Sequence, residues 1–297
     1  MFMSLKKNVV SLLLTLLMLV SLVGHAKSPV FKVSKGDDHV YIGGTIHLLS
    51  PNDYPLPIGF DEAFNGAEKI FFEVNSDDFN TPETQAKSAQ VMMFQDGRTL
   101  KSVLNDDTYN VLSAFLAERQ LPISAFSRFT PAGVSITLTI FELQRLGLGN
   151  PESGVDHFFQ LKTKQLDSKS DNYLETIDEQ IRFLDSFNQV DSNTLILSNL
   201  EDLSVLQVNW EKVLAAWRNG EMLKMSGLLG SDQMRTQFPV IYKTLLTDRN
   251  KRWLKQITPM FNTPEIELVL VGALHLVGED GVIELLRAQG YAVEQLD

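Results

Sequence analysis

The feature that most constrains the fold is a pattern that occurs near both ends of the chain. Residues 40–48 and 268–276 each contain an apolar run that ends in Gly-x-x-His-Leu, with the histidines at positions 47 and 275. Continuous apolar runs of this length are typical of strands buried on both faces of a parallel sheet. Because a loop, a helix and a further strand are expected after each copy, the pattern predicts an α/β fold with a β-sheet core.

The two motifs also predict where a functional site lies. In α/β sheets, sites form just beyond the carboxyl ends of the strands. Gly44 and Gly272 allow a sharp turn or a close approach at that edge. If the two strands are neighbours, His47 and His275 reach the same point, and paired neutral imidazoles suit a divalent first-row metal ion. The alternative is that the two histidines are unrelated and lie in separate loops.

Two charged residues lie in apolar surroundings in the sequence. Glu73 ends the apolar run 69–74, where a carboxylate needs an ion pair, hydrogen bonds or a metal ion. We expect its strand to lie beside the strand before His47, since consecutive elements usually pack together. Arg249 lies on an apolar helical stripe, where arginine usually pairs with a carboxylate or another anion. The alternatives are an exposed strand-end acid for Glu73 and an outward-reaching side chain for Arg249.

The remaining pattern indicates a single domain over residues 27–297. Two β runs at 30–33 and 39–42 predict a hairpin, and an α/β core is expected at about 30–80 and 262–297. Residues of about 81–261 show helical spacing, with Thr-Pro starts at 81 and 130 and long helices at 192–218 and 239–257. We expect this helical part to form a cap over the site and to select the substrate.

The first 26 residues have the pattern of a secretory signal peptide. Lys6 and Lys7 precede an uncharged apolar run at 9–23, and the small residues Gly24 and Ala26 suit cleavage after Ala26. The run is shorter than the roughly 20 residues of a membrane-spanning helix. We therefore expect an exported, periplasmic or extracytoplasmic protein with no stable membrane span after cleavage. An uncleaved anchor is the alternative.

Charge and cysteine content exclude other classes of function. The chain has 26 basic and 37 acidic residues, and cleavage after residue 26 would remove two lysines and no acid. This acidic balance argues against nucleic acid as a partner. The chain has no cysteine, so neither a disulfide nor a thiolate nucleophile or metal ligand can occur.

The chain resembles the TraB/GumN (PrgY-like) family, which includes the TIKI proteases. The resemblance extends over nearly the whole chain after residue 26 and keeps the family's order of motifs. It rests on residues 41–49, 54–57, 72–74, 154–156, 174–176 with Gln180, 217–221, 248–250 and 271–276.

The resemblance implies a fold with two pseudo-symmetric GxxH-bearing halves, similar to erythromycin esterases and ChaN-like haem-binding proteins, and a mostly helical middle part. It implies that His47 and His275 are metal ligands, that Glu73 is a third ligand or the general base, and that Arg249 is an electrophilic partner. The supporting positions in the family motifs are Gly44, Gly272, Asp156 and Glu175. The resemblance gives the two acids among them no specific role.

The leading hypothesis is therefore a metal-dependent hydrolase of peptidase type that binds Mn, Co or Zn. A divalent ion polarises a scissile carbonyl, and two histidines with one carboxylate leave a position open for water. An esterase-like hydrolase without a metal, with His47 as a base oriented by Glu73, is one alternative. A non-enzymatic protein that binds a peptide signal or haem is another. The substrate, a peptide or a small molecule, is not identified by the sequence.

Overall fold

The computed structural model describes residues 27–297, and the predicted signal peptide, residues 1–26, lies outside the described residues. One six-stranded sheet has the order β4-β3-β5-β2-β1-β6. Strands β2, β5, β3 and β4 are parallel, whereas β1 is antiparallel to both β2 and β6. The strands are β1 (Val30–Lys35), β2 (Asp38–Thr45), β3 (Lys69–Phe72), β4 (Ser170–Tyr173), β5 (Glu267–Gly272) and β6 (Ala292–Gln295). The mixed α/β fold predicted from the apolar runs is confirmed.

The two strands that carry the GxxH motifs lie side by side. β2 pairs with β5 in parallel, and the last pair in the register joins Thr45 and Gly272. The expectation for Glu73 was wrong in one respect, because its strand β3 pairs with β5 and β4 and not with β2. β5 comes from the end of the chain and occupies the position between β2 and β3, which a rule about consecutive elements does not anticipate.

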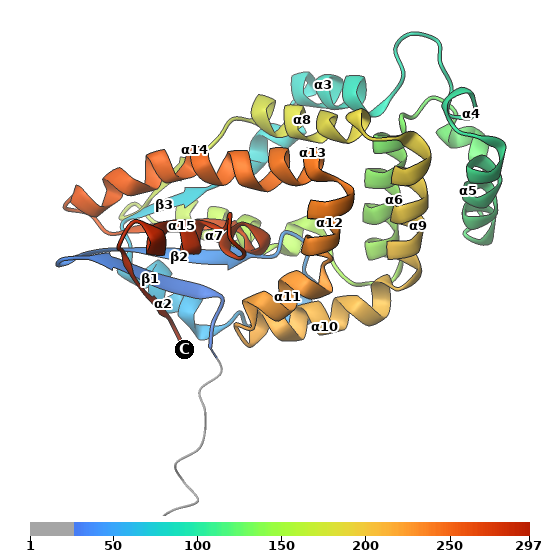
Figure 1. Cartoon of the computed structure of the whole chain (residues 1–297). Helices are drawn as coiled ribbons and strands as arrows, with labels where there is room; N and C mark the ends of the chain where they lie inside the picture. Colours follow the sequence, from blue (N-terminus) through green and yellow to red (C-terminus); the bar gives the residue numbers. More distant parts are fainter. Residues whose placement is uncertain (1–26) are drawn as a thin grey trace, which may run out of the picture.

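Helices cover both faces of the sheet (Figure 1), as its buried central strands require. One face carries α2 (Ile58–Gly66) and α7 (Val155–Lys164), and the other carries α14 (Asp248–Ile257) and α15 (Val282–Ala288). The rings of Phe60 and Phe64 on α2 lie 5.9 and 5.0 Å from that of Phe159 on α7. These aromatic contacts fix α7, which carries a residue of the site, against α2.

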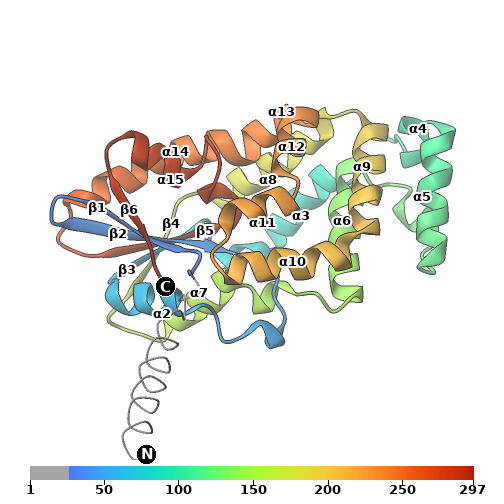
Figure 2. The same cartoon turned by 60° about the horizontal axis from the view of Figure 1, so that its bottom comes forward.

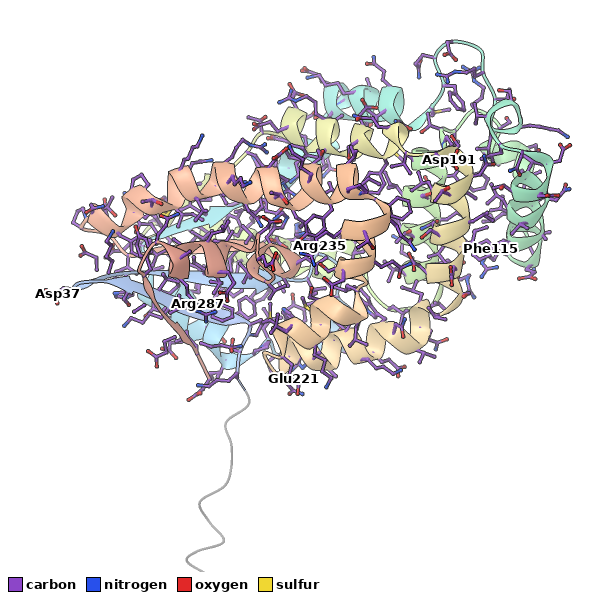
Figure 3. The ribbon with its side chains drawn as sticks, viewed as in Figure 1. Asp37, Phe115, Asp191, Glu221, Arg235 and Arg287 are labelled. Carbon is purple, nitrogen blue, oxygen red and sulfur yellow. The ribbon has the colours of Figure 1, made fainter. Side chains whose placement is uncertain are left out.

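The other helices extend to one side of the sheet, and the arrows of β2 and β3 point toward them (Figures 1 and 2). Asp37 in the β1–β2 turn and Phe115 on α5 lie near opposite ends of the molecule (Figure 3). The helical part thus lies beyond the carboxyl ends of the strands. Its helices are α3 (Pro82–Met92), α4 (Leu100–Val103), α5 (Asp106–Glu118), α6 (Pro131–Arg145), α8 (Ile177–Asp185), α9 (Ser192–Ser204), α10 (Leu206–Arg218), α11 (Met222–Leu228), α12 (Ser231–Gln237) and α13 (Pro239–Tyr242).

The helix starts agree with the sequence better than the helix lengths do. Thr81 and Thr130 cap α3 and α6, and each accepts a backbone N–H bond through its side chain. The single helix expected at 192–218 is wrong, because the chain breaks at Val205 into α9 and α10. The helix expected at 239–257 is continuous in direction but contains a π-helical stretch, Lys243–Thr247, between α13 and α14. Among residues 27–297, no helix is both long and apolar enough to span a membrane.

Candidate functional site

The two GxxH histidines meet at one carboxylate. His47 follows β2 in an irregular segment, and His275 lies in the short 3-10 helix Ala273–Leu276 that follows β5. Their Nε2 atoms lie 3.9 and 4.0 Å from the same oxygen, Oε1 of Glu73. The side chain of His47 is 57% exposed, whereas that of His275 is only 6% exposed. Solvent therefore reaches this group of residues from the His47 side.

Hydrogen bonds fix the protonation of His275. Its Nδ1 lies 2.6 Å from Oδ1 of Asn250, whose amide N–H groups donate to the carbonyls of His275 and Asp280. Since Asn250 Oδ1 can only accept, Nδ1 of His275 carries the proton and Nε2 presents a lone pair. Burial and the nearby Arg249 guanidinium lower the pKa of His275 to about 3, so the ring is neutral. The ring of Trp253, 4.4 Å away between centroids, packs on the imidazole.

His47 is held by an acid from a different part of the chain. Its Nδ1 lies 2.6 Å from Oδ2 of Asp156, and the other carboxylate oxygen accepts a bond of 3.0 Å from the Thr45 hydroxyl. Gly154 lets α7 approach, because a Cβ there would lie 2.2 Å from the carbonyl oxygen of His47. Desolvation by the surrounding protein disfavours the charged ring, but the carboxylates of Asp156 and Glu73 outweigh it and raise the pKa of His47 to about 9.

Arg249 uses all of its hydrogen-bond donors inside the protein. Its Nε donates to Glu175, and its Nη2 donates to both Glu73 and Glu175. Its Nη1 donates to the Leu245 carbonyl at 3.2 Å and lies 3.1 Å from the Nε2 lone pair of His275. A guanidinium has five N–H groups, and five acceptors surround this one. The Leu245 carbonyl belongs to the π-helical stretch, a feature that is frequent at functional sites.

Glu73 is a buried carboxylate whose surroundings favour its charged form. Its Oε1 accepts a 2.7 Å bond from the Gly272 N–H, and its Oε2 accepts from Arg249 and from Gln180. Burial alone would raise the pKa of Glu73, but Arg249, the site histidines and the Gly272 N–H hold it well below its usual range. The net shift is opposite for Glu175, because burial raises its pKa by more than the pairing with Arg249 lowers it. Gln180 joins the two acids by donating to both.

The two motif glycines make room in different places. A Cβ on Gly44 would meet Leu276, Met222 and Ala273 at 3.0–3.1 Å, so this glycine serves close packing between β2 and its neighbours. A Cβ on Gly272 would lie 3.1 Å from His47 Nε2, 3.3 Å from Glu73 Oε1 and 3.5 Å from the His275 ring. The missing side chain of Gly272 therefore leaves a small space that is bounded by the three predicted ligands.

Replacing Gly272 with alanine should impair the site much more than the fold. The backbone at this position, φ −51° and ψ 134°, suits alanine, so the cost in stability is overpacking of about 1–3 kcal/mol. The added methyl group would occupy the space between His47 and Glu73 and should lower metal affinity and activity about tenfold or more. Gly227→Ala is the matched control, because a Cβ there meets nothing within 4 Å. Equal losses in both variants, measured by metal titration and thermal unfolding, would contradict this explanation.

Three residues that complete the site were not identified from the sequence. Asn250 and Gln180 lie in motif stretches of the family resemblance, but no role could be given to them. Thr45 precedes the first histidine by two positions and binds the acid that orients it. Their positions in the sequence were the signal that could have identified them. Asn250 follows Arg249 directly, and Thr45 lies within the first GxxH motif. The structure also gives Asp156 and Glu175 contacts that the sequence could not supply.

Comparison with known proteins agrees with the motif resemblance. The sequence pattern of the TraB/PrgY/gumN family matches residues 29–295. Two curated relatives, each called "Uncharacterized protein YbaP", come from Escherichia coli (strain K12) and Shigella flexneri. Each is 24% identical over 255 residues, which cover 85% of this chain and 89% of the relative. No solved structure gives a significant match. Because the family pattern spans nearly the whole chain, this protein belongs to the TraB/PrgY/gumN family.

Proposed function

We propose that this protein is an exported hydrolase, of peptidase type, whose reaction centre is the group His47, Glu73 and His275 and whose cofactor is a divalent metal ion. One observation carries the proposal: both Nε2 atoms face one oxygen of Glu73 around the space that Gly272 leaves open. In the same proposal, the two GxxH segments belong to pseudo-symmetric halves of an erythromycin-esterase-like or ChaN-like core, and residues of about 81–261 cap it.

The residue types and their supports fit a metal ion. Each imidazole is bound through Nδ1, to Asp156 or Asn250, which leaves both Nε2 atoms toward the shared space, as in other histidine metal sites. Two points oppose the fit. Among residues 27–297, no three ligand-type side chains already have a metal-binding arrangement, so the three groups would have to draw closer. In addition, the ion would compete with Arg249 for the His275 lone pair.

The chain's own groups then have distinct roles. A bound divalent ion would supply Lewis acidity and lower the pKa of a water molecule. Glu73 remains charged beside Arg249, which favours the role of ligand over that of general base. Arg249 donates to Glu73 and Glu175 through Nε and Nη2, and to the Leu245 carbonyl through Nη1, so an electrophilic role would require it to give up one of these bonds. The partly exposed His47 side chain lies on the side from which a substrate would arrive.

A hydrolase without a metal is the second candidate, and the Asp156–His47 pair favours it. A histidine with one nitrogen on a carboxylate and the other open to solvent is the arrangement of general acid–base catalysts. Asp156, and not Glu73 as expected, orients the ring. With its pKa raised to about 9, His47 is protonated at neutral pH and suits proton donation to a leaving group. Haem binding receives less support, because the charged Glu73–Arg249 pair lies beside both rings.

Metal content tests the proposal directly. Protein purified after expression of the full chain should contain about one divalent ion, whereas the double variant His47→Ala/His275→Ala should contain none. His39→Ala is the control, because His39 lies on β2 near the hairpin turn and packs on Tyr41, outside the site. Equal metal content in wild type and double variant would refute the site. If neither wild type nor the double variant binds metal after addition of Mn, Co or Zn, the metal ion is refuted and the hydrolase without a metal becomes the leading candidate. The intact mass of the same sample tests cleavage after Ala26.

A further inference from the structure

His47 and Glu73 follow two strands that do not touch each other. β2 and β3 lie on either side of β5, so no ladder of hydrogen bonds joins them directly. One link between them is β5 itself, through the Gly272 N–H that donates to Glu73. A second link lies outside the sheet, in helix α7, which packs on one face of it (Figure 1). The relative position of the two side chains therefore also depends on how α7 holds the segments that follow β2 and β3.

The first turn of α7 is fixed to the segment that follows β2. The Val155 N–H donates to the Ile46 carbonyl at 3.0 Å, and Asp156 binds the His47 ring. Gly154 allows the helix to begin against the backbone of His47, where a Cβ would not fit. The start of α7 and the first histidine are therefore held together by both side-chain and backbone bonds.

The next turn of α7 is fixed to the segment that follows β3. Gln160 comes four residues after Asp156, so both side chains lie on the same face of the helix. Its Nε2 donates to the Val74 carbonyl at 3.0 Å, and its Oε1 accepts from the N–H and the hydroxyl of Ser76 at 3.0 and 2.7 Å. Gln160 is only 2% exposed, so little water competes for these three bonds. A single buried amide thus attaches the chain just after Glu73 to α7.

These bonds begin where the pairing of the sheet ends. The Glu73 carbonyl accepts from the Glu175 N–H at 3.0 Å, just beyond the last β3–β4 pair. The next carbonyl, that of Val74, accepts from Gln160 instead. The backbone of Glu73 therefore lies at the point where support from the segment after β4 is replaced by support from α7.

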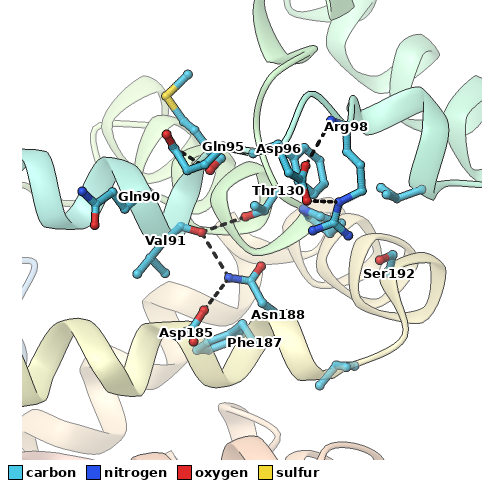
Figure 4. A pocket seen from close by; sticks show the side chains of 15 residues that line it. Gln90, Val91, Gln95, Asp96, Arg98, Thr130, Asp185, Phe187, Asn188 and Ser192 are labelled. Carbon is cyan, nitrogen blue, oxygen red and sulfur yellow. Dashed lines mark hydrogen bonds and ion pairs between the residues drawn. The ribbon is translucent and has the colours of Figure 1, made fainter.

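A second side-chain amide joins distant segments without reaching the site. Asn188 donates to the Val91 carbonyl at 3.1 Å, beside a cavity of about 330 Å³ in the helical part (Figure 4). The residues that line this cavity include none of the histidine site. A bridging amide is therefore not evidence of function by itself. Gln160 differs because its helix also binds His47, and because its partners directly follow Glu73.

We propose that Gln160 is a positioning residue of the histidine site. It fixes the chain after Glu73 to the same helix that orients His47, and it thereby sets the separation of His47 Nε2 and Glu73 Oε1, which is 3.9 Å. Without its three bonds, α7 no longer couples the two segments, although Arg249 and Gly272 still bind the Glu73 carboxylate. The importance of this separation for a reaction rests on the function proposed above, whereas the separation itself does not.

NMR of the full-length protein without metal tests the positioning directly. Gln160→Met keeps the length of the side chain but removes all three bonds. The Gly272 N–H, which donates to Glu73 Oε1 at 2.7 Å, should shift upfield and broaden, because its bond to the carboxylate becomes longer and less uniform. The Nε2 signal of His47 should also shift, whereas its Nδ1 signal should stay, because Asp156 remains in place. Nitrogen labelling of glycine and histidine resolves these signals, and the variants Gly272→Ala and His47→Ala assign them.

Thr163→Val is the matched control on the same helix. Thr163 is also 2% exposed, and its hydroxyl donates to the Phe159 carbonyl at 2.8 Å, so the change removes a buried bond within α7 and leaves the chain of the site alone. Asn188→Leu removes the bridging amide of the helical part. Neither control should shift the signals of the site, although Thr163→Val should lower the melting temperature. Unchanged signals in folded Gln160→Met, or equal shifts in Thr163→Val, would overturn the proposal.

Metal affinity separates this proposal from the function that it deepens. If the wild type binds one ion in titrations with Mn, Co or Zn, Gln160→Met should bind it about 10–100-fold more weakly. Ser76→Ala removes only the hydroxyl bond and should lose less. Equal affinities in wild type and Gln160→Met would overturn the positioning role and leave the proposed metal site standing. If the wild type binds no ion, the proposed cofactor is refuted, and the NMR comparison alone decides the role of Gln160.

Discussion

Replacement of Arg249 with alanine should lower the free energy of unfolding by about 3–5 kcal/mol, as expected when one partner of a buried ion pair is removed. The guanidinium is 7% exposed and pairs with two carboxylates that are 8% and 1% exposed. Without it, Glu73 and Glu175 become buried, neighbouring like charges. Chemical denaturation at pH 7 measures the loss. Arg252→Ala, from the same helix, is the control, because its side chain is 41% exposed and its Nη2 lies 3.7 Å from Glu175, and its loss should cost no more than about 1 kcal/mol.

The pH dependence of Arg249→Ala gives a second test of the same cause. The pKa of Glu175 is already raised by burial, and loss of the neighbouring cation raises it further. A carboxyl with a raised folded-state pKa stabilises the fold below its unfolded value, about 4.3, and this stabilisation is lost as pH rises. The difference between wild type and variant should therefore shrink as pH falls toward 4. A difference that is constant from pH 4 to 8 would assign the loss to packing. If packing is the cause, the triple variant Glu73→Gln/Glu175→Gln/Arg249→Met, which carries none of these three charges, should also be no more stable than Arg249→Ala.

Asp156→Asn should reduce metal affinity about 10–100-fold, although it preserves the shape of the site. The Thr45 hydroxyl donates to one oxygen of Asp156, so the asparagine should keep its carbonyl toward Thr45 and turn its NH₂ toward His47. Loss of the carboxylate removes the main cause of the raised His47 pKa, so the ring becomes neutral. Its Nδ1 must then accept, and its one proton lies on Nε2, which is the atom that faces Glu73. In the metal-free candidate the same change should lower the catalytic rate by about 10⁴, as a wrong tautomer does in a serine protease. Nitrogen NMR of the His47 ring reports the tautomer directly.

The companion variant Thr45→Val/Asp156→Asn isolates the cause. Without the threonine hydroxyl, the asparagine amide is free to turn its carbonyl toward His47, accept from Nδ1 and leave Nε2 without a proton. The double variant should therefore recover part of the affinity that Asp156→Asn loses, although it carries one more substitution. If the double variant is worse than the single one, the hydroxyl does not set the tautomer. If the His47 ring keeps its proton on Nδ1 in Asp156→Asn, the explanation fails at its first step.

The sequence predicted the sheet and the meeting of the histidines for a physical reason. Apolar runs that end in Gly-x-x-His leave few alternatives to buried parallel strands, and parallel neighbours end at the same edge. The Nε2 atoms of His47 and His275 accordingly lie 3.9 and 4.0 Å from the same oxygen of Glu73. The roles of ligand, base and electrophile remain predictions, since they depend on chemistry and not on position alone.

The parts that could not be predicted depend on contacts between distant segments. Asp156 binds a histidine 109 residues away, and neither has a local pattern that specifies the other. The position of β5 between β2 and β3 follows from pairing of the two chain ends, and local periodicity carries no information about it. The break at Val205 has no glycine or proline to indicate it, so the amphipathic pattern continues through it.

The strand order also limits when the protein can become active. β5, which lies between β3 and β2, is made from residues 267–272, so ribosomal synthesis delivers it after the other three strands of the parallel part. Until it inserts, β2 and β3 have no common partner, and His47 lacks both His275 and the Gly272 backbone that holds Glu73. Pairing between such distant segments is intrinsically slow. A chain in which β5 has not yet been made or inserted therefore cannot assemble the group His47, Glu73 and His275, and any reaction proposed for that group requires the folded protein.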